Sequence, residues 1–180
     1  GLGIPAEPLF RSSYVMTSAE ANKKLKQLQE RKKSLVDAER KNAWFVAATT
    51  EDVEEVRKGY TFDYEYDVPE IDRVDNEIRE LKHQINKFNV SCMIPELGMT
   101  IDQVLVYLPQ LKEKQHRLAK MADHLPKQRV NDRYGARSTL IEYEYANYDV
   151  KKAKEDYEKI SKLVADAQLA LDRVNNSVEI

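Results

Sequence analysis

Apolar residues recur every three or four positions between Thr100 and Leu125, and one polar residue, Gln115, interrupts the series. This spacing is that of the a and d positions of a helix that packs lengthwise against other helices. A lone polar residue in such a stripe commonly fixes register or oligomer state, although Gln115 could equally face water at the edge of a bundle. The stripe consists of Ile101, Val104, Leu108, Leu111, Gln115, Leu118, Ala122 and Leu125.

The same period recurs in residues 71–88 and 150–178, and less regularly in residues 21–36. Stripes of this length cannot be buried by a small sheet, so the helices must cover one another. We therefore predict a mainly α fold, an antiparallel bundle of about four long, coiled-coil-like helices. The residues expected to form the helix seams are Ile78, Leu81, Ile85, Leu108, Leu111, Gln115, Leu118, Tyr157, Ile160 and Val164.

Helix boundaries are also marked in the sequence. Thr17 with Glu20, and Thr100 with Gln103, have the three-residue spacing of capping boxes, in which each side chain satisfies the other's free amide. Pro109 lies inside the helix that Thr100 opens. Because proline removes one backbone hydrogen bond, we expect it to kink this helix or to divide it in two.

Two tyrosine-rich segments change the period from 3.5 to two. In residues 60–67 and 139–146, aromatic or β-branched side chains alternate with polar ones, which is typical of a half-buried strand. We predict that the two strands pair into a small hairpin-like sheet with stacked tyrosines. The next helix is then expected to begin at Asp67, where the first strand ends.

The first fifteen residues differ from the rest of the chain. Residues 1–15 hold two prolines, follow neither period and precede Met16. We expect them to be an added or poorly packed lead, with an extended arm that docks on a neighbour as the alternative. Residues 16–180 are expected to form a single helical-bundle domain.

The location of the protein is predicted from three features of the sequence. No run of about 18 apolar residues occurs, so no membrane span is expected. No basic segment followed by an apolar one opens the chain in the manner of a secretory signal. The single cysteine, Cys92, excludes an intramolecular disulfide framework and a C-x-x-C metal pair. Together they indicate a cytoplasmic protein.

Charge is segregated along the chain, although the formal net charge is only −2. Residues 23–41 carry a net charge of +5, residues 51–80 carry −8 and residues 117–137 carry +4. Opposed patches on one small protein favour charge-complementary packing between subunits or with a protein partner. We therefore expect a homo-oligomer.

A second interpretation of the basic segments is contact with nucleic acid. The basic face of the first helix and the loop at residues 127–137 would hold phosphates. Within that loop, Arg129, Arg133 and Arg137 would make the contacts and Tyr134 would stack on a base. The acidic segment at residues 51–80 argues against this interpretation.

No motif assigns a catalytic, cofactor-binding or metal-binding residue. Phosphate-binding and dinucleotide-binding glycine motifs and the G-x-S-x-G elbow are absent from the sequence. Glu80 with His83, and Glu113 with His116, have the E-x-x-H spacing of di-iron bundles. The heptad positions place Glu80 beside its seam and turn Glu113 away from its own, which favours surface salt bridges over a metal centre.

Short motifs are spread along most of residues 17–176. They are Ile85 to Asn89, Thr100, Leu105, Leu108, Leu111, Ser138 to Ile141, Asp149, Val150, Leu171, Asp172, Val174 and Asn175 or Asn176. In these motifs the chain resembles the septicolysin-like family. The resemblance implies a small helical bacterial protein of a family whose members mostly have no established biochemistry. It supplies no catalytic residue for this chain.

The sequence thus favours a non-enzymatic, self-associating helical interaction or scaffold protein without a cofactor. Two alternatives stay open. One is a nucleic-acid-binding helical protein that uses the basic residues of the first helix and of residues 127–137. The other is a metal-dependent bundle enzyme.

Overall fold

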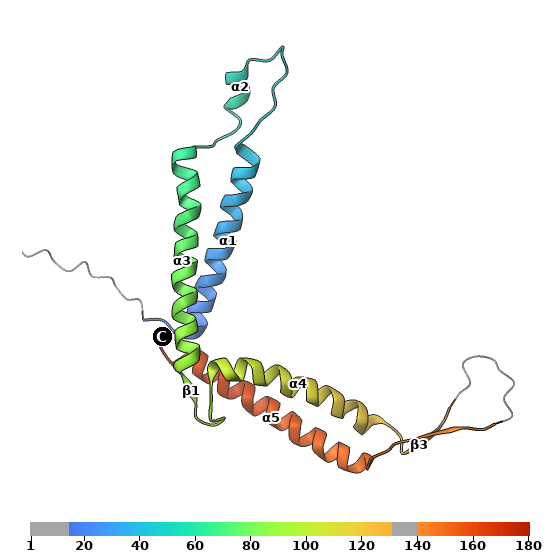
Figure 1. Ribbon diagram of the computed structural model, residues 1–180. Coiled ribbons are helices and arrows are strands. Elements are labelled where there is room, and N and C mark those ends of the chain that lie inside the picture. The colour runs from blue at the N-terminus through green and yellow to red at the C-terminus, as the bar shows by residue number, and fades with distance from the viewer. Residues whose placement is uncertain (1–14, 131–139) are drawn as a thin grey trace, which may run out of the picture. The chain divides into compact units, whose positions relative to one another are not determined.

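The computed structural model describes residues 15–130 and 140–180 (Figure 1). Within them the protein is mainly helical, and its long helices pack against each other, so the predicted fold class is confirmed. The helices are α1 (Ser18–Asn42), α2 (Val53–Arg57), α3 (Tyr64–Ser91), α4 (Ile101–Asp123) and α5 (Val150–Ser177). The short strands are β1 (Met93–Ile94), β2 (Met99–Thr100), β3 (Lys127–Arg129) and β4 (Tyr143–Tyr145).

The chain divides into two compact units. Unit 1 holds the described residues of Gly1–Asn89 and Val174–Ile180, and unit 2 holds those of Val90–Arg173. The sequence analysis expected one domain over residues 16–180. Both unit boundaries fall inside helices, α3 and α5, rather than in a loop. No glycine-rich or proline-rich linker therefore marks the division in the sequence.

Unit 1 is built on the antiparallel pair of α1 and α3, which run side by side in Figure 1. Ala21, Leu81 and Ile85 form its core, and Met16, Leu25 and Leu28 pack around them. Thr17 is the N-cap of α1, and its hydroxyl accepts a hydrogen bond from the Glu20 amide at 3.2 Å. The Glu20 carboxylate accepts from the Thr17 hydroxyl rather than from its amide, so one half of the predicted capping box is present.

Unit 2 is built on α4 and α5, which also pair lengthwise (Figure 1). Thr100 and Gln103 form the predicted capping box at the start of α4, with both reciprocal hydrogen bonds in place. The buried apolar residues of the pair fall on the predicted stripe of α4 and on the facing stripe of α5. They are Ile101, Val104, Leu108, Leu111, Ala122, Val150, Ala153, Ile160, Ala167, Ala170 and Leu171.

Pro109 lies within an unbroken α4, so the second of the two alternatives, that it divides the helix, is wrong. The proline is exposed. Its missing hydrogen bond lies on the solvent side of the helix, and the buried neighbours Leu108 and Leu111 hold the pairing with α5 on the other side.

The predicted strand at residues 60–67 is wrong, because α3 begins at Tyr64. The Asp63 carbonyl accepts the Asp67 amide at 2.7 Å, and the Asp67 carboxylate accepts the Asp63 amide at 2.8 Å. These bonds close the first helical turn. Tyr64 and Tyr66 are both exposed, so the alternating pattern corresponds to no buried face.

The second predicted strand, at residues 139–146, is present as the shorter β4, while residue 139 lies outside the described residues. β4 pairs with β3 in antiparallel fashion, with Lys127 opposite Tyr145 and Arg129 opposite Tyr143. The expected pairing of β4 with residues 60–67 is therefore wrong. Sequence analysis did not predict the other hairpin, β1–β2, in which Gly98 adopts a φ of 63°.

Two further expectations concern the first fifteen residues and a membrane span. The lead proposed for residues 1–15 lies outside the described residues except for Val15. Among the helices that the structure describes, none combines the length and the apolar character that a bilayer crossing requires.

Candidate interaction surfaces

The first candidate surface lies on one side of the α1–α3 pair in unit 1. Lys32 of α1 and Asp75 of α3 form an ion pair of 2.6 Å across the two helices. Side chains three or four positions from this pair lie on the same side of their helices. They are Leu28 and Val36 on α1 and Ile71 and Ile78 on α3, all only half-buried. We call these six residues the open face of unit 1.

The opposite side of the same pair is closed by a different ion pair. Glu70 is 9% exposed and accepts a hydrogen bond from Arg31 at 2.6 Å. Its second carboxylate oxygen pairs with Arg73, one turn further along α3. Both oxygens of the one nearly buried carboxylate are therefore neutralised within the chain, which leaves this side electrostatically satisfied.

Burial is uneven along α1. Of its 25 residues only Ser18 and Ala21 are buried. Leu25, Leu28, Leu35 and Val36, which the sequence placed on a buried stripe, remain half-exposed in this chain alone. α3 buries Val74, Leu81 and Ile85, yet Ile71 and Ile78 on the open face keep part of their surface in contact with solvent.

The second candidate surface is the β3–β4 ribbon of unit 2. Side chains alternate between its two faces, so Lys127, Arg129, Tyr143 and Tyr145 share one face. The Lys127 ammonium lies 4.4 Å from the centre of the Tyr143 ring and 5.7 Å from that of Tyr145. The face is thus cationic and aromatic, and its lysine already covers the tyrosine rings.

A histidine joins this ribbon to the end of α4. The His124 Nε2 atom lies 2.5 Å from a carboxylate oxygen of Glu144, and Nδ1 lies 2.7 Å from the Leu125 carbonyl oxygen. Both ring nitrogens face acceptors, which only the doubly protonated ring satisfies. The Leu125 carbonyl, and then the Glu144 carboxylate, raise the pKa of His124 above its ordinary value of 6.5. Nearby, the Tyr148 hydroxyl donates to the Met121 carbonyl at 2.7 Å.

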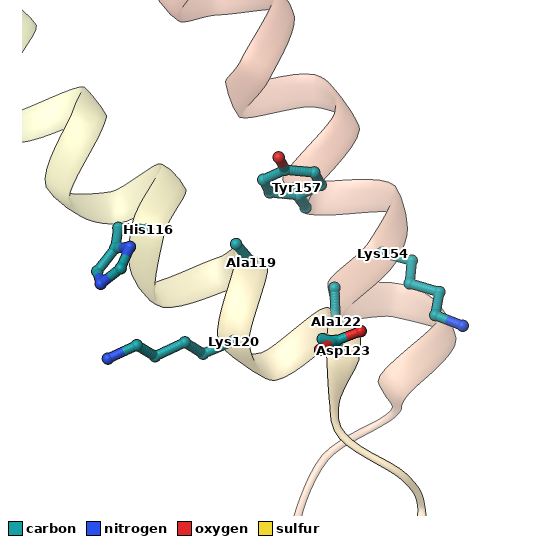
Figure 2. A pocket seen from close by; sticks show the side chains of 7 residues that line it. All are labelled: His116, Ala119, Lys120, Ala122, Asp123, Lys154 and Tyr157. Atoms are coloured by element: carbon teal, nitrogen blue, oxygen red, sulfur yellow. The ribbon is translucent and has the colours of Figure 1, made fainter.

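A shallow hollow of about 490 Å³ lies between the ends of α4 and α5 (Figure 2). Ala119, Ala122 and Tyr157 are among the residues that line it. In Figure 2, Lys120 extends to one side of the helix pair and Lys154 to the other. Since the charged groups diverge instead of meeting over one point, the hollow offers no convergent binding site for a small ligand.

The predicted nucleic-acid contacts are only partly described. Arg129 is exposed on β3, beside Tyr143. Arg133, Tyr134 and Arg137 lie outside the described residues.

The predicted seam residues differ in how far they are buried. Those that are buried are Leu81, Ile85, Leu108, Leu111 and Ile160, and those that are half-buried are Ile78, Gln115, Leu118, Tyr157 and Val164. Gln115 contacts α5, where its amide nitrogen donates to the Ser161 hydroxyl at 3.1 Å.

The carboxylates and histidines that raised the question of a metal centre are exposed. Glu80 and His83 lie on α3, and Glu113 and His116 lie on α4. Across the described part of the chain, no three histidine, cysteine, aspartate or glutamate side chains gather closely enough to hold an ion.

Sequence analysis did not single out the aromatic cluster beyond the C-terminal end of α1. The Phe45 and Tyr60 rings stack with their centres 5.5 Å apart, and the Arg57 guanidinium lies 4.9 Å above Phe45. Trp44 beside them is 75% exposed. The aromatic residues of this segment were the sequence feature from which the cluster could have been predicted.

Comparison with known proteins supports the fold. No family model and no curated protein matches the chain. One similar solved structure is described as a functionally unknown conserved protein from Corynebacterium diphtheriae. It is 20% identical, with a TM-score of 0.58, and the match covers 92% of this chain and 99% of that one. At this identity the likeness concerns the fold alone.

Proposed function

We propose that this protein is a non-enzymatic, self-associating helical interaction protein, and that unit 1 carries the association. The observation behind the proposal is the poor burial of α1, which hides only Ser18 and Ala21 within its own chain. The half-exposed apolar side chains on the open face gain burial only when another surface covers them.

The gain in free energy on association follows from the apolar area that is covered. Each square ångström of apolar surface removed from water contributes about 25 cal/mol, so covering several half-exposed leucine, valine and isoleucine side chains contributes several kcal/mol. Two isolated helices leave most of their apolar surface in water, and bundles add further helices to cover it. A second helix pair would supply that cover.

Two weaker expectations belong to this proposal. We propose a cytoplasmic location, which is supported by a single cysteine in 180 residues. We also propose membership of the septicolysin-like family, which is supported by the short motifs at residues 85–89 and 171–176. Neither expectation enters the argument for self-association.

The test is the mass of the full chain in solution between about 1 and 100 μM, measured by light scattering and sedimentation. We expect a multimer that forms in both low and high salt, because apolar burial is screened little by salt. The double variant Ile71→Asn, Ile78→Asn should weaken association. The matched control Val106→Asn, at a position of α4 that is 60% exposed, should not. A monomer across the whole range would refute the proposal.

A second candidate function is binding of single-stranded nucleic acid by the ribbon. The observation that favours it is the shared face of Lys127, Arg129, Tyr143 and Tyr145. Such binding should weaken steeply as salt increases, and Arg129→Ala should reduce the slope of that dependence by about one. Absence of binding to mixed RNA and DNA oligonucleotides at low salt would exclude it.

A further inference from the structure

Two rows of exposed charges border the open face of unit 1. On α1, Lys33 and Arg40 flank Val36 at three and four positions, and on α3, Asp72 and Arg79 flank Asp75 in the same way. Both rows therefore lie on the side of the Lys32–Asp75 pair. The rows repeat every seven residues, as the charged positions beside a coiled-coil seam do. The α1 row is Lys26, Lys33 and Arg40, and the α3 row is Glu65, Asp72 and Arg79.

Most of these charged side chains have no ionic partner among the described residues. Among the described residues, Lys26, Lys33, Glu65 and Asp72 form no ion pair, and Arg40 reaches only Asp37, at 3.9 Å. The opposite side of the helix pair has the contrary arrangement, since its charges meet around Glu70. The free charges and the half-exposed apolar residues thus occur on the same side.

Two copies of the chain can pack through their open faces about a two-fold axis in two ways. If the axis crosses the helices, α1 lies against α1 of the other copy in the opposite direction, and Lys33 meets Lys33 while Asp72 meets Asp72. If the axis runs along the helices, α1 lies against α3 of the other copy. Within one chain the Lys32–Asp75 and Arg31–Glu70 ion pairs bracket the register of the antiparallel helices, and this second packing keeps a register between those two.

In the second packing, Lys33 lies level with Asp72 of the other copy, and Arg40 lies level with its Glu65. The two-fold axis repeats both pairings. The remaining pair, Lys26 with Arg79, carries like charges and lies at the other end of the rows. Four attractive pairings against two repulsive ones favour this packing, whereas the α1 row meets only like charge in the first.

We infer that a second copy of this chain docks on the open face with its axis along the helices, so that Lys33 and Arg40 of each copy face Asp72 and Glu65 of the other. This inference rests on the proposed self-association and specifies its partner and its direction. The apolar side chains supply the affinity, and the rows of charge select the arrangement.

Charge reversal tests the inference. Variant A is Lys33→Glu with Arg40→Glu, and variant B is Glu65→Lys with Asp72→Lys. Each alone should dimerise about ten- to a hundredfold more weakly than the native chain at low salt, because four attractive pairings between exposed charges become repulsive. A mixture of A and B should form heterodimers at native strength, since every altered pair is again of opposite charge.

The matched control is Lys23→Glu with Lys41→Glu, which changes the net charge of α1 as variant A does. These two lysines are exposed and lie outside the seven-residue spacing of the charge row. Lys41 lies roughly 100° around the helix from Arg40, and Lys23 roughly 60° from Lys26. The control should dimerise at native strength. Equal weakening of the control and variant A would show a general effect of charge and would overturn the inference.

Disulfide trapping gives an independent measurement of direction. In a Cys92→Ser background, Lys33→Cys and Asp72→Cys variants, one of them carrying an affinity tag, should cross-link when mixed. Lys33→Cys alone should not cross-link to itself. A multimer in which Lys33→Cys self-links would overturn the inferred direction and leave the proposed self-association intact. A monomeric native chain would overturn both.

Discussion

His124 Nε2 lies 2.5 Å from a carboxylate oxygen of Glu144, and this contact connects the end of α4 to the middle of β4. The second ring nitrogen faces the Leu125 carbonyl at 2.7 Å. The His124 ring therefore contacts three parts of unit 2: the end of α4, the turn after it and the ribbon.

The first prediction concerns the pH dependence of this contact. Because the folded pKa of His124 is raised above 6.5, its contribution to stability is fully present below pH 6.5. That contribution is lost as the pH rises through the folded pKa. Proton NMR titration of the three histidines should show His124 with a raised pKa. Glu144→Gln should bring that pKa closer to its ordinary value, and an unchanged titration in this variant would contradict the assignment.

The second prediction concerns the capping box of α4. Thr100→Ala removes the acceptor of the Gln103 amide hydrogen bond, which measures 3.3 Å. Loss of an N-cap side chain should lower the free energy of unfolding by about 1 kcal/mol, measured by urea unfolding. Thr61→Ala, at an exposed position before α3, is the control and should change it by less than about 0.5 kcal/mol.

The third prediction compares two leucines of α4. Leu111 is 5% exposed and faces α5, whereas Leu105 is 48% exposed. Leu111→Ala should lower the free energy of unfolding by about 2–5 kcal/mol because it leaves a cavity in the core. Leu105→Ala leaves no cavity and should cost well under about 1 kcal/mol. Similar losses for the two variants in urea unfolding would show that α4 does not pack along its predicted stripe.

The fourth prediction concerns Glu70, which accepts from both Arg31 and Arg73. Glu70→Gln removes the charge but keeps the shape of the side chain. Since both arginines are largely exposed, screening limits the loss to about 1–2 kcal/mol of unfolding free energy. The exposed pair of Glu54 with Arg57 supplies the control, because Glu54→Gln should have almost no effect. Equal losses of stability in the two variants would show that the ion pairs of Glu70 contribute no more than an exposed pair.

The helices could be predicted wherever a buried stripe and a cap occurred together. α4 is such a case, because its apolar period and its Thr100–Gln103 box give the same starting point. Residues 60–67 show the opposite case. Their alternation of aromatic and acidic residues is a strand signal only if one face is buried, and in the structure Tyr64 and Tyr66 face solvent at the start of a helix.

The candidate surfaces could not be predicted to the same extent, because they depend on which helix lies against which. The heptad rows at Lys33 and Asp72 were present in the sequence. Their common side became definable only when the Lys32–Asp75 contact oriented the two helices. The same holds for the ribbon, because its β3 strand, Lys127 to Arg129, has no apolar alternation that would predict its pairing with β4.

The shallow packing of α1 has a consequence for how long its backbone amides stay protected from deuterium. With only Ser18 and Ala21 buried, α1 separates from α3 at a small free-energy cost, whereas α4 is held by five buried apolar residues. Hydrogen exchange in dilute protein should therefore label α1 well before α4. As the protein becomes more concentrated, the α1 amides should exchange more slowly. The exchange rate of this one helix therefore reports the fraction of the protein that is associated.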